Sequence, residues 1–285
     1  MKRLGIATIL LGLLAAACGG KAGSLGPVPS GSPAPGPSIT PPSPTGTPSG
    51  SPTSSPGHPF TFQVWLVRGG RLFVTRRTEP LVPAVGQLAL DALVAGPNAA
   101  EVAASVRSEI PPGIAADITA LAWGVATVDL DPQFFQAAAS GSALRRGQVV
   151  YTLTQYSTIS SISFTRGGAT VYDHPWSRKD FAGLLPAITV ESPTIGQRVS
   201  SPVTVSGTAN VFEATVSLRI LDASGNEIAR TFTQASCGTG CRGDYSVSVP
   251  YTIGSEQRGT VEVYEVSAKD GSAINVVDIP VILTP

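Results

Sequence analysis

Hydrophobic and polar residues alternate along much of the chain after about residue 60, which is the spacing of β-strands. Apolar residues alternate over 62–66 and again over 72–74, on either side of Gly69-Gly70. This pattern predicts two antiparallel strands joined by a tight turn. The spacing then changes, because apolar side chains from Val85 to Leu93 recur at helical steps. Gly96-Pro97 is expected to end that helix.

The succession of paired strands and helices continues to residue 173. Second and third hairpins are predicted around Trp123-Gly124 and Gly167-Gly168. A helix that opens at Ser140-Gly141-Ser142 is expected between them, and its expected buried face consists of Val149, Val150, Leu153 and Tyr156. The order ββ-α-ββ-α-ββ predicts an α+β domain over residues 60–173, with helices on one face of a sheet.

Strand-like alternation dominates the last hundred residues of the chain. About seven short strands are expected between residues 187 and 285, which predicts an all-β, immunoglobulin-like sandwich. Residues 174–186 are interpreted as a connector between the two domains. The predicted strands cover 188–191, 203–207, 214–221, 227–233, 244–249, 260–267 and 273–283.

The first 17 residues have the pattern of a secretory signal peptide. Lys2 and Arg3 precede an apolar run that is shorter than the roughly 20 residues needed to cross a bilayer. The run ends in small residues before Cys18 and resembles the lipobox of bacterial lipoproteins, although Leu14 stands one place early. The resemblance implies cleavage before Cys18 and lipid attachment to it. An ordinary cleavage site beside an incidental cysteine is the alternative.

Residues 18–59 consist almost entirely of Pro, Ser, Gly and Thr. Such a segment has too little apolar surface to offset the entropy lost on folding, so a disordered tether is predicted. Fully extended at about 3.1 Å per residue, it would reach roughly 130 Å. A tether of this kind would hold the folded domains away from a membrane surface.

The charge balance argues against a nucleic-acid partner, and the cysteine count indicates a disulfide. The chain has 19 Lys and Arg against 19 Asp and Glu, so no nucleic-acid partner is expected, because phosphate binding needs a basic excess. If Cys18 carries a lipid, Cys237 and Cys241 remain as a pair, and a structural disulfide is predicted for an oxidising compartment. Free thiols or a redox or metal site are the alternatives.

Several sequence segments of the first domain resemble the sporulation and spore germination (GerMN) domain. They are residues 88–97, Val128-Asp129-Leu130 followed by Phe134-Phe135, and residues 148–155 ahead of a strand and a glycine turn. The resemblance covers most of this domain. It implies a non-catalytic extracytoplasmic module, often carried by lipoproteins and related to ring-building motifs of secretion-like assemblies.

Several sequence segments of the second domain resemble the immunoglobulin-like domain of bacterial spore germination. They are residues 205–209, Phe212-Glu213-Ala214, Val249-Pro250-Tyr251 and residues 265–272. The resemblance covers nearly the whole domain, and that family often follows a GerMN domain. It implies a recognition or packing module with no assigned chemistry.

Few residues offer catalytic chemistry. Asp129 and Asp131 would point to one face of a strand and could form a carboxylate pair for glycoside hydrolysis. A polar strand end before Pro132 is the preferred interpretation. A Ser-His-Asp triad would need His174, which is interpreted as a connector residue, since the chain has only one other histidine.

Calcium is a further metal for which ligands could be considered. Glu213, Glu265 and Asp270 could supply oxygen ligands, but no closely spaced acidic loop supports that arrangement. No catalytic, cofactor-binding or metal-binding residue is therefore predicted, and no cofactor is expected.

The hypothesis that combines these features is a non-enzymatic lipoprotein on the outer leaflet of the cytoplasmic membrane. Its two domains would bind envelope proteins or further copies of the chain, in a cell-envelope or a sporulation- or germination-related assembly. The alternative is a peptidoglycan- or wall-glycan-binding protein, in which Trp65, Trp123 or Trp176 stacks on sugars. A hydrolase that uses the aspartate pair is the third hypothesis.

Overall fold

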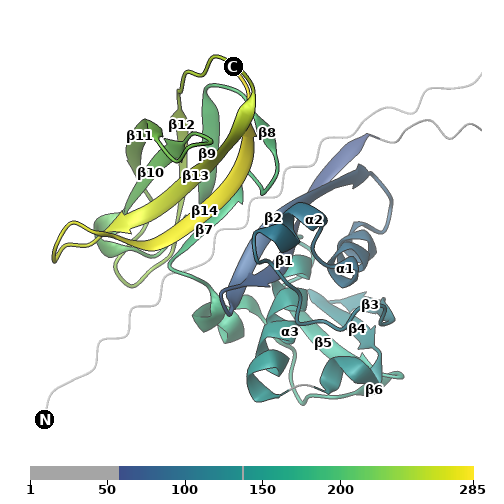
Figure 1. The fold of residues 1–285 in the computed structure, drawn as a ribbon. Coiled ribbons are helices and arrows are strands. Elements are labelled where there is room, and N and C mark those ends of the chain that lie inside the picture. Colours follow the sequence, from purple (N-terminus) through teal and green to yellow (C-terminus); the bar gives the residue numbers. More distant parts are fainter. Residues whose placement is uncertain (1–57, 137) are drawn as a thin grey trace, which may run out of the picture. The chain divides into compact units, whose positions relative to one another are not determined.

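A computed structural model describes residues 58–136 and 138–285 of the chain. The predicted signal peptide, Cys18 and nearly all of the predicted tether lie outside these residues. The described residues form an α+β domain followed by an all-β domain, as predicted (Figure 1). No helix among them has the length and apolar character needed to cross a bilayer.

The α+β domain begins with a long hairpin. β1 (Pro59–Arg68) pairs antiparallel with β2 (Arg71–Pro80), which confirms the first predicted hairpin. Gly69 and Gly70 form the turn with φ angles of 57° and 74°. A two-residue hairpin turn of this type needs the left-handed conformation at both positions, and glycine adopts it without a steric cost.

A second sheet follows, in the order β3-β4-β5-β6. Its strands are β3 (Ala116–Ala122), β4 (Val125–Leu130), β5 (Ser161–Arg166) and β6 (Ala169–Thr170). The sequence pattern predicts one sheet, but the structure divides the strands between two, because β1 and β2 pair with each other and with none of the other strands described. β4 and β5 are parallel, so the chain must cross over between them.

Helices occupy both predicted positions. α1 (Val85–Ala95) buries Ala89, Leu90 and Leu93. α3 (Ala139–Leu153) buries the predicted Val149, Val150 and Leu153 and provides the crossover from β4 to β5.

Four short helical segments among the described residues were not expected from the sequence. They are α2 (Ala99–Ala103) and the 3-10 helices η1 (Pro132–Phe135), η2 (Arg178–Leu184) and η3 (Phe212–Ala214). α2 begins with a capping box, in which the Asn98 side chain accepts from the Glu101 N–H and the Glu101 carboxylate accepts from the Asn98 N–H. A helix of five residues is too short to show apolar periodicity, so only its cap could signal it.

Polar side chains of α3 and of the turn that follows it cover the free edge of β1. Thr152 Oγ1 accepts from the Trp65 N–H at 3.0 Å, and Gln148 donates to the Trp65 carbonyl at 3.1 Å. Gln155 accepts from the Gln63 N–H at 2.7 Å and donates to its carbonyl at 2.8 Å. These bonds satisfy backbone groups that a buried strand edge would otherwise leave without partners. They explain why Gln148 and Thr152 lie on the inner face of this helix.

The second domain contains two sheets, in the orders β11-β10-β13-β14-β8 and β12-β9-β7. All seven predicted strands are present, and the two-residue β8, which lies parallel to β14, is additional. The strands are β7 (Ile188–Ser192), β8 (Arg198–Val199), β9 (Val203–Ala209), β10 (Thr215–Leu221), β11 (Glu227–Gln234), β12 (Gly243–Val249), β13 (Gln257–Val266) and β14 (Ala273–Leu283).

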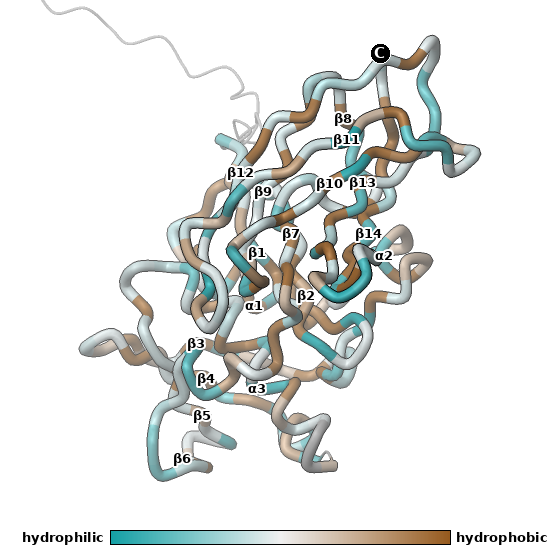
Figure 2. The backbone as a smooth tube through the Cα atoms, turned by 90° about the vertical axis from the view of Figure 1, so that its left-hand side faces the viewer, coloured by the Kyte–Doolittle hydropathy of each residue, from teal (hydrophilic) through white to brown (hydrophobic). Residues whose placement is uncertain are grey.

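Apolar residues recur along these strands and fill the interior (Figure 2). β9 passes between β7 and β12, and Gly207 of β9 is paired with Val190 of β7. A Cβ atom at Gly207 would overlap the Thr189 carbonyl. The Tyr245 hydroxyl reaches across this glycine and donates to the same carbonyl at 2.9 Å. Burial raises the pKa of Tyr245 above its usual range, so its hydroxyl stays a donor.

Candidate interaction surfaces

Trp123 lies at the tip of the β3–β4 hairpin, and its side chain is fully exposed. Its φ angle is 54° and that of Gly124 is 80°, so both turn residues are left-handed. The other two tight hairpins of this domain place Gly-Gly at the same two positions. A bulky residue in this conformation costs roughly 1–3 kcal/mol. Folding alone would favour glycine or asparagine here, so the turn does not explain the tryptophan.

Two runs of exposed apolar residues lie beside one groove. Residues 81–84 (Leu-Val-Pro-Ala) and 120–123 (Ala-Leu-Ala-Trp) are exposed at all eight positions. Pro83, Ala84 and Leu121 line a groove of about 470 Å³ between the two runs. Soluble domains rarely expose three or four consecutive apolar residues unless they bind something. We call residues 81–84 and 120–123, with the groove between them, the hairpin face.

Gln87 and Tyr156 are two polar residues of the groove wall, which also includes Val85, Gly86, Ile118 and residues 157–159. Gln87 donates to the Ala116 carbonyl and accepts from the Ile118 N–H, both at 2.9 Å, and so covers part of the edge of β3. The strand register shifts between Ile118 and Ala120, and β3 is the edge strand of its sheet. Tyr156 donates to the Val85 carbonyl at 3.0 Å, and burial raises the pKa of Tyr156 to about 12. The groove wall is therefore neutral at physiological pH.

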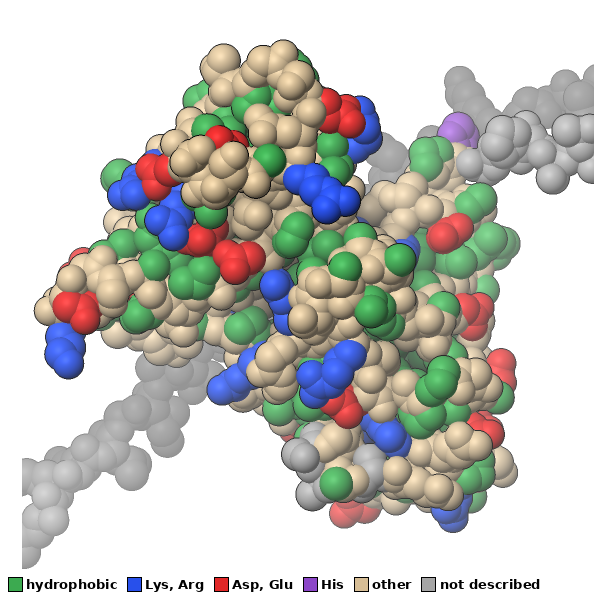
Figure 3. Space-filling model, in the orientation of Figure 1, with side chains coloured by type: hydrophobic (Ala, Val, Ile, Leu, Met, Phe, Trp, Pro, Cys, Tyr) green, Lys and Arg blue, Asp and Glu red, His purple; other side chains and the backbone are tan. Residues whose placement is uncertain are grey.

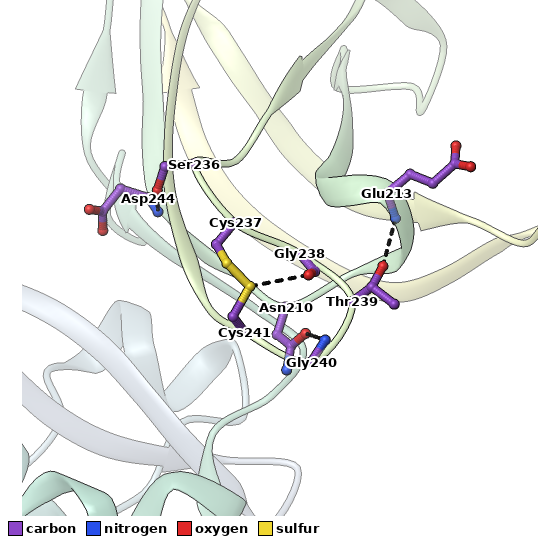
Figure 4. The surroundings of a disulfide bond; sticks show 9 residues. All are labelled: Asn210, Glu213, Ser236, Cys237, Gly238, Thr239, Gly240, Cys241 and Asp244. Atoms are coloured by element: carbon purple, nitrogen blue, oxygen red, sulfur yellow. Dashed lines mark hydrogen bonds between the residues drawn. A yellow bond between two sulfur atoms is a disulfide. The ribbon is translucent and has the colours of Figure 1, made fainter. Parts of the chain in front are cut away.

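The second domain has a strained turn of its own at Phe212–Ala214. Glu213 and Ala214 have φ angles of 52° and 57°, and Phe212 is 51% exposed. The Phe212 N–H donates to Glu265 Oε1 at 2.9 Å. The Glu213 N–H donates to Thr239 Oγ1 at 3.1 Å (Figure 4). Two consecutive left-handed residues are held only where surrounding contacts fix them.

A disulfide loop provides part of this support. Cys237 and Cys241 are joined, with Cα atoms 5.7 Å apart (Figure 4). Within the loop, the Thr239 N–H donates to the Val211 carbonyl at 3.0 Å and the Gly240 N–H to Asn210 Oδ1 at 3.0 Å. A loop this short stabilises a fold by only roughly 2 kcal/mol, so its clearest effect is local. It braces the turn that exposes Phe212.

Two protein-family models match the chain in succession. The model described as sporulation and spore germination matches residues 69–172. The model described as the immunoglobulin-like domain of bacterial spore germination matches residues 187–272. The chain carries a GerMN domain followed by a germination-type immunoglobulin-like domain. The resemblance inferred from the sequence is therefore confirmed for both domains, and neither description names a reaction.

Solved structures resemble the chain only weakly. The tandem GerMN domains of the sporulation protein GerM from Bacillus subtilis are 14% identical, covering 79% of this chain and 61% of that one, with a TM-score of 0.39. The first GerMN domain of the same protein is 19% identical, covering 42% and 98%, with a TM-score of 0.34. CopC from Methylosinus trichosporium is 17% identical, covering 34% and 94%, with a TM-score of 0.23. At these scores none of the three indicates a function. No curated protein matches the chain.

In the GerMN domain, the two aspartates considered for hydrolysis are engaged in local structure. Asp129 accepts from the Thr165 hydroxyl at 2.6 Å and from the Gly168 N–H at 2.9 Å. The bond from Thr165 is the main reason that the pKa of Asp129 lies below its usual value. Asp131 accepts from the Gln133 N–H at 2.8 Å and caps η1. Both carboxylates therefore have structural roles of the kind expected for a strand end.

The residues considered for calcium are likewise engaged separately. Glu265 binds the Phe212 N–H and the Asn275 amide, and Asp270 accepts from the Ser272 N–H and hydroxyl in its own turn. Glu213 is exposed. Across residues 58–136 and 138–285, no three or more His, Cys, Asp or Glu side chains are grouped so as to hold a metal ion.

The three tryptophans and His174 differ in their surroundings. Trp65 is only 3% exposed and packs on Tyr151, so the suggestion that it stacks on sugars is wrong. Trp176 is half-buried, with its ring centre 4.7 Å from the Arg146 guanidinium carbon. His174 is exposed, and its Nδ1 lies 2.6 Å from Asp173 Oδ1. Trp123 is the tryptophan whose side chain is available to a partner.

Proposed function

We propose that the chain is a non-enzymatic, lipid-anchored protein of the cell envelope whose GerMN and immunoglobulin-like domains bind other proteins. The observation that carries this proposal is the exposure of a large aromatic residue at a strained turn in each domain. Trp123 and Phe212 both occupy or adjoin left-handed positions that cost folding energy. Strain of this kind is retained where a side chain must be presented to a partner.

The placement of the carboxylates also supports a binding role. Asp129, Asp131 and Glu265 each accept hydrogen bonds that hold a turn or a helix start in place. A hydrolase of the kind considered from the sequence needs two carboxyl groups that face a substrate. The descriptions of both matched families mention spore germination. They support an envelope or spore-related assembly as the place where the chain acts.

Anchoring is proposed from the N-terminal sequence. A signal peptide that ends at Cys18 and a Pro-rich tether would place both domains outside the cytoplasmic membrane, on its outer leaflet. The expected partners are envelope proteins, including further copies of the chain.

The test of anchoring is the mass of the mature N-terminus combined with cell fractionation. We expect an acylated Cys18 as the first residue and recovery of the protein with membranes. A Cys18→Ser variant is expected to leave the membrane fraction, because the lipid has no other attachment point. A cytosolic protein with its leader intact, or a mature chain that begins elsewhere without lipid, would contradict the proposal.

A further inference from the structure

Charge is divided unevenly within the GerMN domain. From Thr78 to Leu144 the sequence has seven acidic residues and one basic residue, Arg107. From Arg145 to Pro186 it has five basic residues and two acidic ones. In Figure 3 the right-hand side of this domain shows acidic and hydrophobic side chains, whereas basic side chains gather towards its left and lower parts. The segment that contains the hairpin face is thus acidic as well as apolar.

Two acidic residues adjoin the hairpin face. Glu79 lies two residues before the first exposed run, with Pro80 between them. Asp91 accepts from Gln87 of the groove wall at 2.7 Å. Among the described residues, neither carboxylate forms an ion pair, whereas Glu101 and Glu109 of the same region pair with Arg77 and Arg107. The negative charge beside the groove is therefore not neutralised within the domain.

We propose that the hairpin face binds a basic, apolar polypeptide segment of a partner protein. Bulky apolar side chains of the segment pack on Trp123 and Leu121 and enter the groove beside them, while its Lys or Arg side chains lie near Glu79 and Asp91. Apolar burial provides the affinity, and the charges select the partner and speed its approach. This inference depends on the proposed function in one respect: the chain and its partner must both lie outside the cytoplasmic membrane.

Charge favours this partner over a lipid surface. Loops that insert into bacterial membranes usually combine apolar residues with Lys or Arg, which are attracted to anionic headgroups. The hairpin face has the apolar residues but adjoins Glu79 and Asp91, and residues 78–106 contain no Lys or Arg. An anionic bilayer would be repelled by this arrangement, whereas a basic segment would be attracted.

The experiment selects ligands from a random displayed-peptide library with the chain from Gly19 to Pro285 as bait. We expect the selected peptides to combine Lys or Arg with Leu, Ile, Phe or Trp. Synthetic copies are then titrated calorimetrically against the bait and its variants. Trp123→Asn is expected to weaken binding by roughly tenfold or more, because the main apolar contact is lost. The double change Glu79→Gln with Asp91→Asn is expected to weaken it roughly threefold at low salt and to flatten its salt dependence.

A loss of peptide binding by Trp123→Asn must be distinguished from a loss of folding. Asn-Gly is a preferred sequence for the β3–β4 turn, so Trp123→Asn is expected to keep or raise the thermal stability. Phe232 is 68% exposed in the immunoglobulin-like domain, and Phe232→Asn serves as the matched control with unchanged peptide binding.

Several results would overturn the inference. These are selection of no peptides, selection of peptides without a basic excess, and binding that survives Trp123→Asn. Trp123-dependent binding to vesicles or to isolated peptidoglycan, without peptide binding, would assign the surface to a lipid or a glycan instead. The bait carries no lipid, so a failure of the proposed anchoring would leave the peptide result unchanged.

Discussion

Replacing Arg77 by alanine is expected to lower the free energy of unfolding by about 3–5 kcal/mol, because it leaves a buried carboxylate without its counter-charge. Glu101 is 1% exposed, and Arg77 donates to both of its carboxylate oxygens at 2.7 Å. The Thr75 hydroxyl donates to the same carboxylate at 2.6 Å. Unfolding of the chain in urea would measure the change.

The control for this prediction is a second variant that also removes the charge of Glu101. Burial alone would raise the pKa of Glu101, but hydrogen bonds from Arg77, Thr75 and the Asn98 N–H outweigh it and hold the pKa below its usual value. Adding Glu101→Gln to Arg77→Ala is expected to recover part of the lost stability, since no buried charge then remains. A loss below about 1 kcal/mol for Arg77→Ala would mean that the pair contributes no more than an exposed ion pair.

Gly207→Ala is expected to destabilise the immunoglobulin-like domain by roughly 3 kcal/mol. The added methyl group would overlap the Thr189 carbonyl, which belongs to the neighbouring strand and cannot move without disturbing β7 and its bond from Tyr245. Thermal unfolding would measure the effect.

Gly254→Ala is the matched control, because a Cβ atom there meets nothing within 4 Å and the backbone is not left-handed. Its expected effect lies within about 0.5 kcal/mol. Equal stability of the two glycine variants would contradict the close packing of β7 on β9.

Much of the fold follows from the spacing of apolar residues. The strands of the immunoglobulin-like domain and the three hairpins of the GerMN domain alternate clearly, and glycine marks each tight turn. The division into two sheets could not be predicted, because it depends on contacts between distant segments. Gln148 and Thr152 show the difficulty, since polar side chains on an inner helix face suggest solvent until β1 is placed beside them.

The hairpin face was harder to predict than the fold. The sequence predicts a hairpin around Trp123-Gly124, but a one-dimensional pattern does not show where a hairpin extends beyond the core. The 51% exposure of Leu121 becomes clear only in the structure. One signal was present in the sequence: Trp123 stands where the other two hairpins have glycine. The unusual residue at this turn is apparent only beside the Gly-Gly turns of the other two hairpins.

The most direct test of a binding role is site-specific photo-crosslinking in the native envelope. A photoreactive amino acid at Leu121 of the full-length chain would be activated in intact cells, and the adducts identified by mass spectrometry. We expect one dominant protein adduct, joined through a segment rich in Lys or Arg, whose yield falls when Glu79→Gln and Asp91→Asn are introduced. An envelope-located chain that gives only lipid or glycan adducts from this position, or none, would contradict the account.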